Sequence, residues 1–304
     1  MAYQLADSPP LPAASLTDDE LAVALAEGAG AVLLGLRHDV DASGAPLDDK
    51  ALRAAGDQAS QEWLAAALSA TRPDDVVLSE EAKDDATRLI AERVWIIDPL
   101  DGTREFAERD GETGQWRDDF AVHIALWQQG KGLTVGAVSL PARGQVYSSG
   151  TVSPVAPVVS DAGMAEPVLG LDAASAATET ASAGKPLPLR IAASRTRPPA
   201  FVADLAASGA IDLVPMGSAG VKVISAVDGT VDGYLHAGGQ YEWDSAAPVA
   251  VAQAAGLICT RLDGSDLAYN QPDPYLPDLF IAHPAAAAQL RALVAQTNPS
   301  TTEA

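Results

Sequence analysis

Apolar positions in the first 75 residues recur at the spacing of a helix. Between residues 18 and 38 they stand four or seven positions apart, and the stretch Thr17-Asp18-Asp19-Glu20 before them has the T-x-x-E form of a capping box. We therefore predict a helix over 18–38. A second predicted helix begins at Gly56-Asp57, continues through Leu68 and ends where Arg72-Pro73 stops it.

The pattern then changes to short runs of apolar and β-branched residues, separated by turns that contain Gly or Pro. These runs predict five strands, over 76–78, 94–97, 121–127, 134–140 and 145–147. Two helices followed by a meander of strands are typical of an α+β layer.

Residues 150–188 are rich in Ala, Ser, Pro, Thr and Gly and show little apolar periodicity, so we predict a flexible surface loop or interdomain insertion there. Strand-like and helix-like segments alternate after it, which predicts a smaller α/β unit. The strands are expected at 189–193, 211–215 and 233–236, and the helices at 199–207, 218–227 and 244–255. The chain is thus expected to divide into 1–149, 150–188 and 189–304.

Composition narrows the function classes. The 304 residues are 48% apolar, enough for the core of one large domain or two ordinary ones, and the single Cys259 excludes an intrachain disulfide. A formal charge of −22 argues against nucleic acid and anionic membrane as partners. Residues 1–30 lack the pattern of a signal peptide, and no run approaches the roughly 18 apolar residues of a membrane span, so we expect a cytoplasmic protein.

Two aspartates close one of the predicted strands. In the stretch VWIIDPLDGTREF, the apolar run 94–97 ends in Asp98 and Asp101. Pro99 favours a β-turn, which would bring both carboxylates and the Leu100 carbonyl to one point. Oxygen ligands at this density suit a hard cation such as Mg²⁺, which would also turn an acidic site into an attractive one for phosphate.

The residues that follow extend this interpretation. Gly102 lets the backbone approach a ligand closely, and Thr103 adds a hydroxyl beside the backbone N–H groups that a phosphate could accept from. A bare D-P-x-D is equally compatible with an ordinary Asp-rich turn. The D-x-D-G-T loop of haloacid-dehalogenase-like phosphatases is excluded, because Pro99 stands where that loop needs its nucleophilic aspartate.

Acidic residues gather at two further places. Glu80 follows the predicted strand 76–78, and Asp244 precedes an Ala-rich helix. Taken alone, Asp244 is read as a helix N-cap, and so is Asp57.

Other polar residues have ordinary interpretations as well. His123 and His236 lie in strand-like apolar runs and are interpreted as core histidines with ordinary hydrogen bonds. Trp95 and Trp243, each beside an acidic motif, are interpreted as packing residues.

Three blocks together resemble the signature set of the inositol monophosphatase superfamily, the lithium-sensitive, Mg²⁺-dependent phosphomonoesterases. They are LSEE at 78–81, WIIDPLDGTREF at 95–106 and YEWDSAAPVAVAQAAG at 241–256. Weaker similarity covers nearly all of the chain outside 150–188. The resemblance implies an α+β fold, a layered α-β-α-β-α sandwich of the inositol monophosphatase and fructose-1,6-bisphosphatase type, with metals at the junction of its two halves.

Within that superfamily the chain is most similar to an actinobacterial branch of the CysQ-type 3′-phosphoadenosine 5′-phosphate phosphatases. Ser194-Arg195-Thr196 resembles their S-R-S-H stretch, with Arg197 in place of the histidine. Residues 217–222, GSAGVK, resemble their G-S-S-x-K segment, with Ala219 in place of the second serine. This similarity implies hydrolysis of the 3′-phosphate in sulfur assimilation, with the sulfated nucleotide, 3′-phosphoadenylyl sulfate, as a further candidate substrate.

The resemblance also implies a role for each motif residue. Asp57 would help to place a metal or its water, and Thr103 would orient the attacking water together with an acidic partner such as Glu80. Two or three Mg²⁺ ions are implied, with Mn²⁺ as a substitute and Li⁺ as an inhibitor. The implied metal ligands are Glu80, Asp98, the Leu100 carbonyl, Asp101 and Asp244.

The expected partner is a small phosphorylated nucleotide, and the family often forms homodimers. Candidate substrate contacts are Gly102, Thr103, Arg195, Ser218, Lys222 and Asp244. Ser218 would act at a helix N-terminus, and Lys222 and Arg195 are candidates for the second phosphate. Lys222 could instead be a solvated surface residue, and Arg195 could pair with one of the 41 acidic residues.

Two alternatives to this function stay open. The same metal site would serve an inositol-1-phosphate or fructose-1,6-bisphosphate phosphatase. A non-catalytic protein that binds Mg²⁺ and a nucleotide would retain the fold, although the intact acidic blocks and Thr103 weigh against it.

Overall fold

The computed structural model describes residues 8–44, 46–155 and 188–297, and it contains two five-stranded sheets. The first sheet has the order β1-β2-β3-β4-β5 and the second the order β7-β6-β8-β10-β9. The elements of the first half are α1 (Asp18–Ser43), α2 (Asp49–Thr71), β1 (Val76–Ser79), η1 (Ala86–Ile90), β2 (Arg93–Asp101), α3 (Thr103–Phe106), β3 (Ala121–Gln128), β4 (Gly132–Leu140), η2 (Pro141–Arg143) and β5 (Gln145–Ser148).

The second half contributes the remaining elements. They are β6 (Leu189–Ser194), α4 (Ala200–Ala207), β7 (Ile211–Met216), α5 (Ala219–Val227), β8 (Gly233–Tyr241), α6 (Glu242–Ala254), β9 (Ile258–Thr260), β10 (Tyr275–Ala282) and α7 (Pro284–Thr297).

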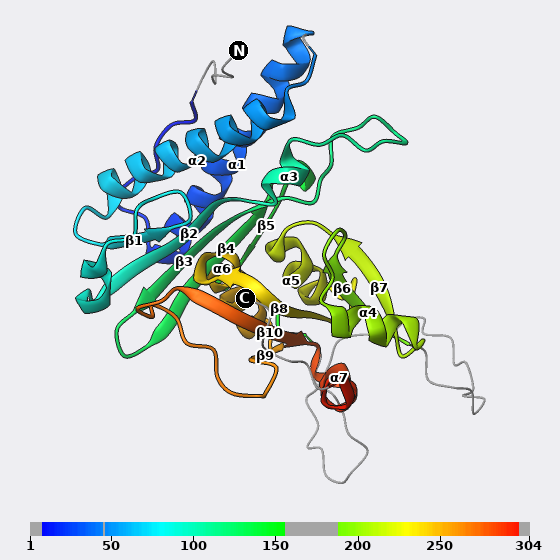
Figure 1. Cartoon of the computed structure of the whole chain (residues 1–304). Coiled ribbons are helices and arrows are strands. Elements are labelled where there is room, and N and C mark those ends of the chain that lie inside the picture. Colours follow the sequence, from blue (N-terminus) through cyan, green and yellow to red (C-terminus); the bar gives the residue numbers. More distant parts are fainter. Residues whose placement is uncertain (1–7, 45, 156–187, 298–304) are drawn as a thin grey trace, which may run out of the picture.

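The elements stack in layers. Helices α1 and α2 pack on one face of the first sheet, while α6 packs on β2, β3 and β4 and beside α5. Helix α5 contacts β6 and β8 of the second sheet, and α4 and α7 lie together with contacts to β7 and β10 (Figure 1). This order confirms the predicted α+β layered sandwich.

The alternation of side chains along β2 explains this layering. Trp95 and Ile97 belong to the core under α1 and α2, whereas Val94 and Ile96 belong to the core shared with α5 and α6. All four are fully buried. A strand covered on both faces needs apolar residues at every position, which is why this run does not alternate with polar residues.

Helix α2 starts earlier than its predicted start at Gly56-Asp57. Asp48 caps it by accepting a hydrogen bond from the Ala51 backbone N–H, 3.0 Å long. Gly56 lies inside this helix. A Cβ at this position would be 2.6 Å from the Phe106 ring, so close packing, and not a helix start, explains the glycine. Asp57 is therefore a mid-helix residue and does not begin the helix.

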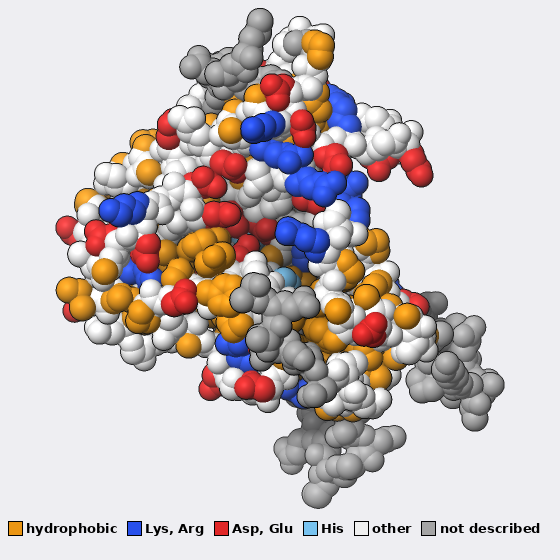
Figure 2. Space-filling model, in the orientation of Figure 1, with side chains coloured by type: hydrophobic (Ala, Val, Ile, Leu, Met, Phe, Trp, Pro, Cys, Tyr) orange, Lys and Arg blue, Asp and Glu red, His pale blue; other side chains and the backbone are white. Residues whose placement is uncertain are grey.

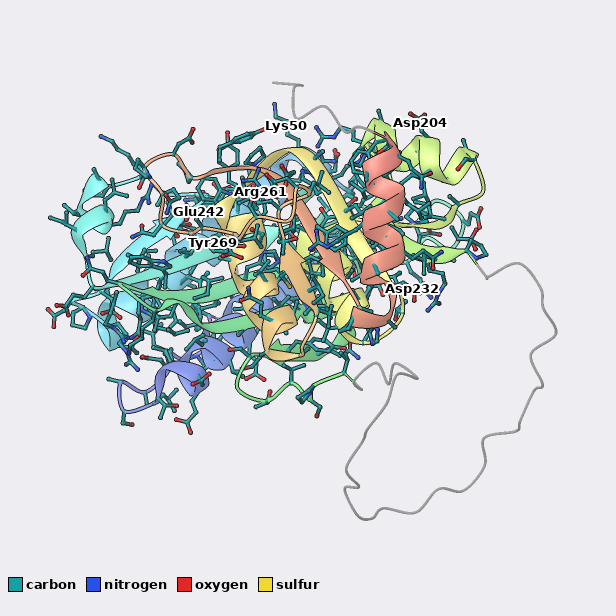
Figure 3. The ribbon with its side chains drawn as sticks, turned by 90° about the horizontal axis from the view of Figure 1, so that it is seen from below. Lys50, Asp204, Asp232, Glu242, Arg261 and Tyr269 are labelled. Atoms are coloured by element: carbon teal, nitrogen blue, oxygen red, sulfur yellow. The ribbon has the colours of Figure 1, made fainter. Side chains whose placement is uncertain are left out.

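The sequence interpretation missed β9, β10 and α7. Strand β10 reads YLPDLFIA, and Pro277 and Asp278 interrupt its apolar pattern. Asp278 is nevertheless buried, because Arg261 donates two hydrogen bonds to it, 2.9 and 2.7 Å long. Figure 3 shows Arg261, Tyr269 and Glu242 close together, where the connection from β9 to β10 crosses α6.

Most of the predicted insertion, 156–187, lies outside the described residues. The residues just before it already pack on the second half of the fold. The Val155 N–H donates a hydrogen bond to the Ala255 carbonyl, 2.8 Å long. The division into 1–149, 150–188 and 189–304 stays a prediction. Within the ranges that the structure describes, no helix combines the length and apolar character needed to cross a bilayer.

Candidate metal and active site

The two aspartates of the DPLD stretch lie in a β-bulge, and the predicted β-turn is wrong. Strand β2 continues to Asp101, with Asp98 opposite His123 and Asp101 opposite Ala121, and the register shifts between them. The Leu100 N–H, left out of the ladder, donates to Asp98 Oδ1 at 3.0 Å. A bulge re-aims side chains without ending the strand, so both carboxylates still reach one point.

Three carboxylates converge there. Ligand oxygens of Asp98, Asp101 and Asp244 all lie within 4.8 Å of one another. Asp98 is fully buried and its Oδ2 has no hydrogen-bond partner. Burial, followed by the charges of Glu80 and Asp101, raises the pKa of Asp98 well above its ordinary value. An unpaired carboxylate oxygen in an all-oxygen cluster is suited to bind a hard cation such as Mg²⁺.

Asp101 is held in its charged form. Its Oδ2 accepts hydrogen bonds from the Ser218 hydroxyl and from the Gly220 N–H, the latter 2.8 Å long, and lies 3.2 Å from His123 Nε2. Burial raises the pKa of Asp101, but the adjacent His123 ring, with Lys222 and the Ser218 hydroxyl, lowers it to about 2. Its other oxygen is left for a metal.

His123 is a buried histidine with an ordinary hydrogen bond, as predicted, and it lies in addition beside Asp101 in this site. Its Nδ1 lies 3.1 Å from the Trp243 carbonyl, and both neighbours of the ring are acceptors. A Cβ on Gly220 would come within 2.1 Å of His123 Nε2, so the start of α5 closes tightly over the ring. Only the strand register, which sets His123 opposite Asp98, reveals this role.

Asp244 enters the cluster from the first turn of α6. The N-cap is Tyr241, whose N–H donates to Asp244 Oδ2 at 2.6 Å, so the predicted N-cap role of Asp244 is wrong. Burial, followed by the charge of Asp101, raises the pKa of Asp244 to about 7. Its neighbour Glu242 holds the loop between β9 and β10, because it accepts a hydrogen bond from the Asn270 N–H, 2.6 Å long.

Glu80 approaches from the neighbouring strand. Strand β1 runs parallel to β2 with Ser79 opposite Ile97, so Glu80 and Asp98 follow the paired residues at the same edge. Desolvation by the surrounding protein, followed by the charges of Asp244 and Asp101, raises the pKa of Glu80 to about 8. The structure thus brings all four predicted carboxylates into one electrostatic group.

Thr103 and Asp57 also meet, although Asp57 is on α2. The Thr103 hydroxyl donates to the Leu100 carbonyl at 3.1 Å and its side chain also interacts with the Asp57 carboxyl group. Burial, followed by the charge of Glu81, raises the pKa of Asp57 to about 7. Helix α2 is fixed to the bulge by the Ser60 hydroxyl, which donates to the Pro99 carbonyl at 2.7 Å.

Gly102 occupies a position that only glycine fits well. Its φ is +85°, and a Cβ there would lie 3.2 Å from both the Asp119 carbonyl and Ser218 Cβ. The chain from β2 into α3 is therefore pressed against the start of α5. This contact joins the two halves of the fold at the carboxylate cluster of Asp98, Asp101 and Asp244.

The candidate basic residues differ in their surroundings. Lys222 is only 6% exposed, so it is not a solvated surface residue. Its Nζ donates a hydrogen bond to the Gly217 carbonyl, 3.3 Å long, and lies 5.3 Å from the centre of the Tyr234 ring. Arg195 forms ion pairs with Asp119 and Glu105, as its alternative interpretation expects. Figure 2 shows acidic side chains gathered in the middle of one face, with basic side chains along one flank.

Asp119 organises this flank, and no sequence motif marks it. It accepts from the Gly217 N–H at 2.7 Å, from Arg117 Nε at 3.1 Å and from Arg195. Burial raises the pKa of Asp119, but Arg117 and the other donors lower it below its ordinary value. The loop before α5 is thereby tied to the first half beside the metal cluster.

Comparison with known proteins supports this geometry. The model of the inositol monophosphatase family matches residues 17–297. The chain is 48% identical over 277 residues to a protein of Mycobacterium leprae (strain TN) named 3′-phosphoadenosine 5′-phosphate phosphatase, covering 88% of this chain and 90% of that protein. It is 30% identical over 224 residues to the 3′(2′),5′-bisphosphate nucleotidase CysQ of Escherichia coli (strain K12), covering 73% and 81%.

Among solved structures, inositol monophosphatase II of Staphylococcus aureus MSSA476 superposes with a TM-score of 0.65 at 18% identity, over 92% of this chain and 96% of that one. At this identity the likeness concerns the fold alone. The similarity to the CysQ-type enzymes, expected from the three sequence blocks, is confirmed by the curated relatives. From the family match over 17–297 and the relative that spans most of its length, we conclude that the chain belongs to the inositol monophosphatase family.

Proposed function

We propose that this protein is a Mg²⁺-dependent phosphomonoesterase that hydrolyses 3′-phosphoadenosine 5′-phosphate to AMP and phosphate. The observation that carries the proposal is the joining of an oxygen-only carboxylate cluster to a buried lysine in one site. The cluster suits a metal and a phosphate ester, and Lys222 supplies a cation for a second anionic group. The name of the Mycobacterium leprae relative supports the same substrate.

The residues that would hold Mg²⁺ are Glu80, Asp98, the Leu100 carbonyl, Asp101 and Asp244. When bound there, Mg²⁺ neutralises the charge of the phosphate and lowers the pKa of a coordinated water. Asp101, kept ionised by His123, Ser218 and Gly220, would supply a permanent negative ligand. Two or three ions, substitution by Mn²⁺ and inhibition by Li⁺ are parts of this proposal.

Thr103 and Asp57 would act on the attacking water. A carboxyl group whose pKa is about 7 can accept a proton near neutral pH, and the Thr103 side chain links Asp57 to the Leu100 carbonyl. Oxygen of the water forms a bond to phosphorus, the bond to the ribose 3′-oxygen breaks, and that oxygen takes up a proton. Glu80, with its pKa of about 8, is a second group able to hold a proton here.

The substrate would be held from both halves. Backbone N–H groups of Gly102 and Thr103 face the phosphate being removed, and Asp244 contacts the sugar beside its metal. Ser218 and Lys222 approach from α5, and Arg195 would have to leave Asp119 and Glu105 to reach the second phosphate. The setting we propose is cytoplasmic sulfur assimilation, with the sulfated nucleotide as a second substrate and a homodimer as the working form.

Phosphate release from four substrates tests the proposal, each with and without Mg²⁺. The panel contains 3′-phosphoadenosine 5′-phosphate, its sulfated form, inositol 1-phosphate and fructose 1,6-bisphosphate. We expect Mg²⁺-dependent release that is fastest per unit concentration for the adenosine bisphosphate. Faster release from inositol 1-phosphate or fructose 1,6-bisphosphate would replace the proposed substrate, and release from none of them would favour a binding protein.

A further inference from the structure

Strand β8 carries two buried polar atoms that lack a partner. In the described residues, the buried side-chain atoms without a hydrogen bond are Arg53 Nε, Asp98 Oδ2, His123 Nε2, His236 Nε2 and Gln240 Oε1. Those of Asp98 and His123 belong to the metal cluster. A buried polar atom left unpaired is costly, so two on one strand call for a ligand.

These atoms lie next to the metal cluster, on the side of the second sheet. Gln240 Nε2 donates to the Tyr234 hydroxyl at 3.0 Å, and the Tyr234 and His236 ring centres are 6.2 Å apart. The Tyr234 ring in turn faces Lys222 Nζ. The charges of Asp101 and Asp244 act on the Tyr234 hydroxyl, where they add to burial in raising its pKa. A substrate bound at the metals would therefore meet this group next.

Both unpaired atoms are hydrogen-bond acceptors. The His236 ring forms a hydrogen bond with the backbone of Gly238, which takes one ring N–H and leaves Nε2 with a lone pair. Burial lowers the pKa of His236 to about 4, so the ring is neutral at physiological pH. Gln240 has used its amide nitrogen on Tyr234, and its oxygen is free. Two acceptors beside a lysine match a ligand that carries hydrogen-bond donors next to an anionic group.

We propose that His236 and Gln240 recognise the nucleoside part of the substrate by accepting hydrogen bonds from its donors, a ribose hydroxyl or the exocyclic amino group of adenine. This inference rests on the proposed function and names the residues that separate a nucleotide from other phosphate esters. A site that pairs its buried acceptors with the correct ligand rejects ligands that leave them unpaired. His236 as a whole residue is partly exposed, although its Nε2 is buried.

The test measures AMP binding to the Mg²⁺-loaded protein by calorimetry, in wild type and in the variants His236→Phe and Gln240→Met. Each variant removes one acceptor and keeps a side chain of similar size, and Gln240→Met also removes the donor to the Tyr234 hydroxyl. We expect each to weaken AMP binding about tenfold, the loss of about 1.4 kcal/mol. Binding of inorganic phosphate, which has no nucleoside, is expected to change less than about twofold, because a few tenths of a kcal/mol is the usual background.

Controls separate recognition from folding. Gln145→Met changes an exposed glutamine on β5 and is expected to bind AMP as wild type does. His236→Gln restores a hydrogen-bonding atom and is expected to recover most of the affinity lost in His236→Phe. Thermal unfolding of every variant shows whether a loss of binding follows from a loss of structure.

The nucleobase distinguishes the two donors. If the adenine amino group is recognised, wild type binds IMP more weakly than AMP, and the variants lose this preference. If a ribose hydroxyl is recognised, the variants weaken AMP and IMP binding equally. Unchanged AMP binding, or an equal loss for AMP and inorganic phosphate, would overturn the assignment. If wild type binds AMP but releases no phosphate from 3′-phosphoadenosine 5′-phosphate, the proposed function fails and this binding site stands.

Discussion

His123 Nε2 lies 3.2 Å from Asp101 Oδ2, between two strands that meet at the metal cluster. Both residues are buried. Their contact gives Asp101 a pKa shift opposite to that of Asp98, which is three positions earlier in the sequence. The pKa of Asp101 is lowered to about 2, whereas burial and nearby carboxylates raise the pKa of Asp98. Asp101 is therefore held as an anion, whereas the charged form of Asp98 is disfavoured.

Loss of the His123 ring should destabilise the metal-free protein. In His123→Phe the buried Asp101 carboxylate keeps its two hydrogen bonds but loses the imidazole nitrogen 3.2 Å from its Oδ2, and taking one partner from a buried polar group costs about 1–3 kcal/mol. Urea unfolding without Mg²⁺ measures this loss. Saturating Mg²⁺ should restore part of the stability by supplying positive charge at the cluster. A variant as stable as wild type without metal would show that the pair contributes nothing.

Gly220→Ala should have a similar effect through packing. The new Cβ would stand 2.1 Å from His123 Nε2, so the ring or the start of α5 must move. Such overpacking typically costs about 1–3 kcal/mol, and a displaced His123 would also lower kcat. The matched control is Gly111→Ala, where a Cβ meets nothing within 4 Å. Equal melting temperatures and rates for the two variants would contradict the expected clash.

The stabilisation by Mg²⁺ should grow with pH. In the metal-free protein the pKa of Glu80 is about 8 and that of Asp244 about 7, both above their ordinary values of 4.5 and 3.8. The folded state therefore binds these protons more tightly than the unfolded state, and the free energy of unfolding falls as pH rises through about 4 to 8. Mg²⁺ needs ionised ligands, so it should raise the melting temperature more at pH 8.5 than at pH 6.

Thermal unfolding with and without Mg²⁺ at the two pH values measures the difference. The double variant Glu80→Gln/Asp244→Asn serves as the control, because it removes both titrating groups. An increment in melting temperature that is the same at pH 6 and pH 8.5 in wild type would argue against metal binding by these carboxylates.

Lys222→Met should separate the two classes of substrate. The lysine makes no ion pair in the part of the chain that the structure describes, and burial lowers its pKa, so its charge is held at a cost. Methionine keeps the stem, and we expect a melting temperature at least equal to that of wild type. KM for 3′-phosphoadenosine 5′-phosphate should rise about tenfold or more, because a charged hydrogen bond contributes about 1.5–3 kcal/mol. An equal rise for inositol 1-phosphate would contradict a role in binding the second phosphate.

The strand pattern brought Asp98 and Asp101 together, and the resemblance of the three sequence blocks added Glu80 and Asp244. The structure places the four carboxylates in one group, and their role as metal ligands stays a prediction. Sequence patterns missed the place of His123 in this site because it depends on the register between β2 and β3, which brings His123 opposite Asp98. Asp119 was missed for a similar reason, since its partners come from three separate segments. The DPLD bulge was read as a turn because proline fits both, and only the continued pairing of Asp101 with Ala121 distinguishes them.

The helix starts show the same limit. The T-x-x-E box predicted the start of α1 correctly, and its reciprocal hydrogen bonds are present. Helix α2 begins at Asp49 because Asp48 caps it, yet Gly56 suggested a later start. That glycine is explained by tertiary contact with Phe106, which no local pattern contains.

Asp98→Asn should remove catalysis while leaving the metal-free fold intact. Burial, followed by the charge of Glu80, raises the pKa of Asp98 well above its ordinary value, so its charged form is disfavoured without metal, and an uncharged amide of nearly the same shape costs little there. The melting temperature without Mg²⁺ should therefore stay within about 2 °C of wild type, a change of about 1 kcal/mol or less. With Mg²⁺ the wild type should be stabilised and the variant should not. Since loss of a residue that only supports a metal ligand costs 10–100-fold, loss of this ligand should lower kcat/KM by at least about 100-fold. Normal turnover at saturating Mg²⁺, or a Mg²⁺-induced rise in melting temperature equal to that of wild type, would refute the assignment of Asp98 as a metal ligand.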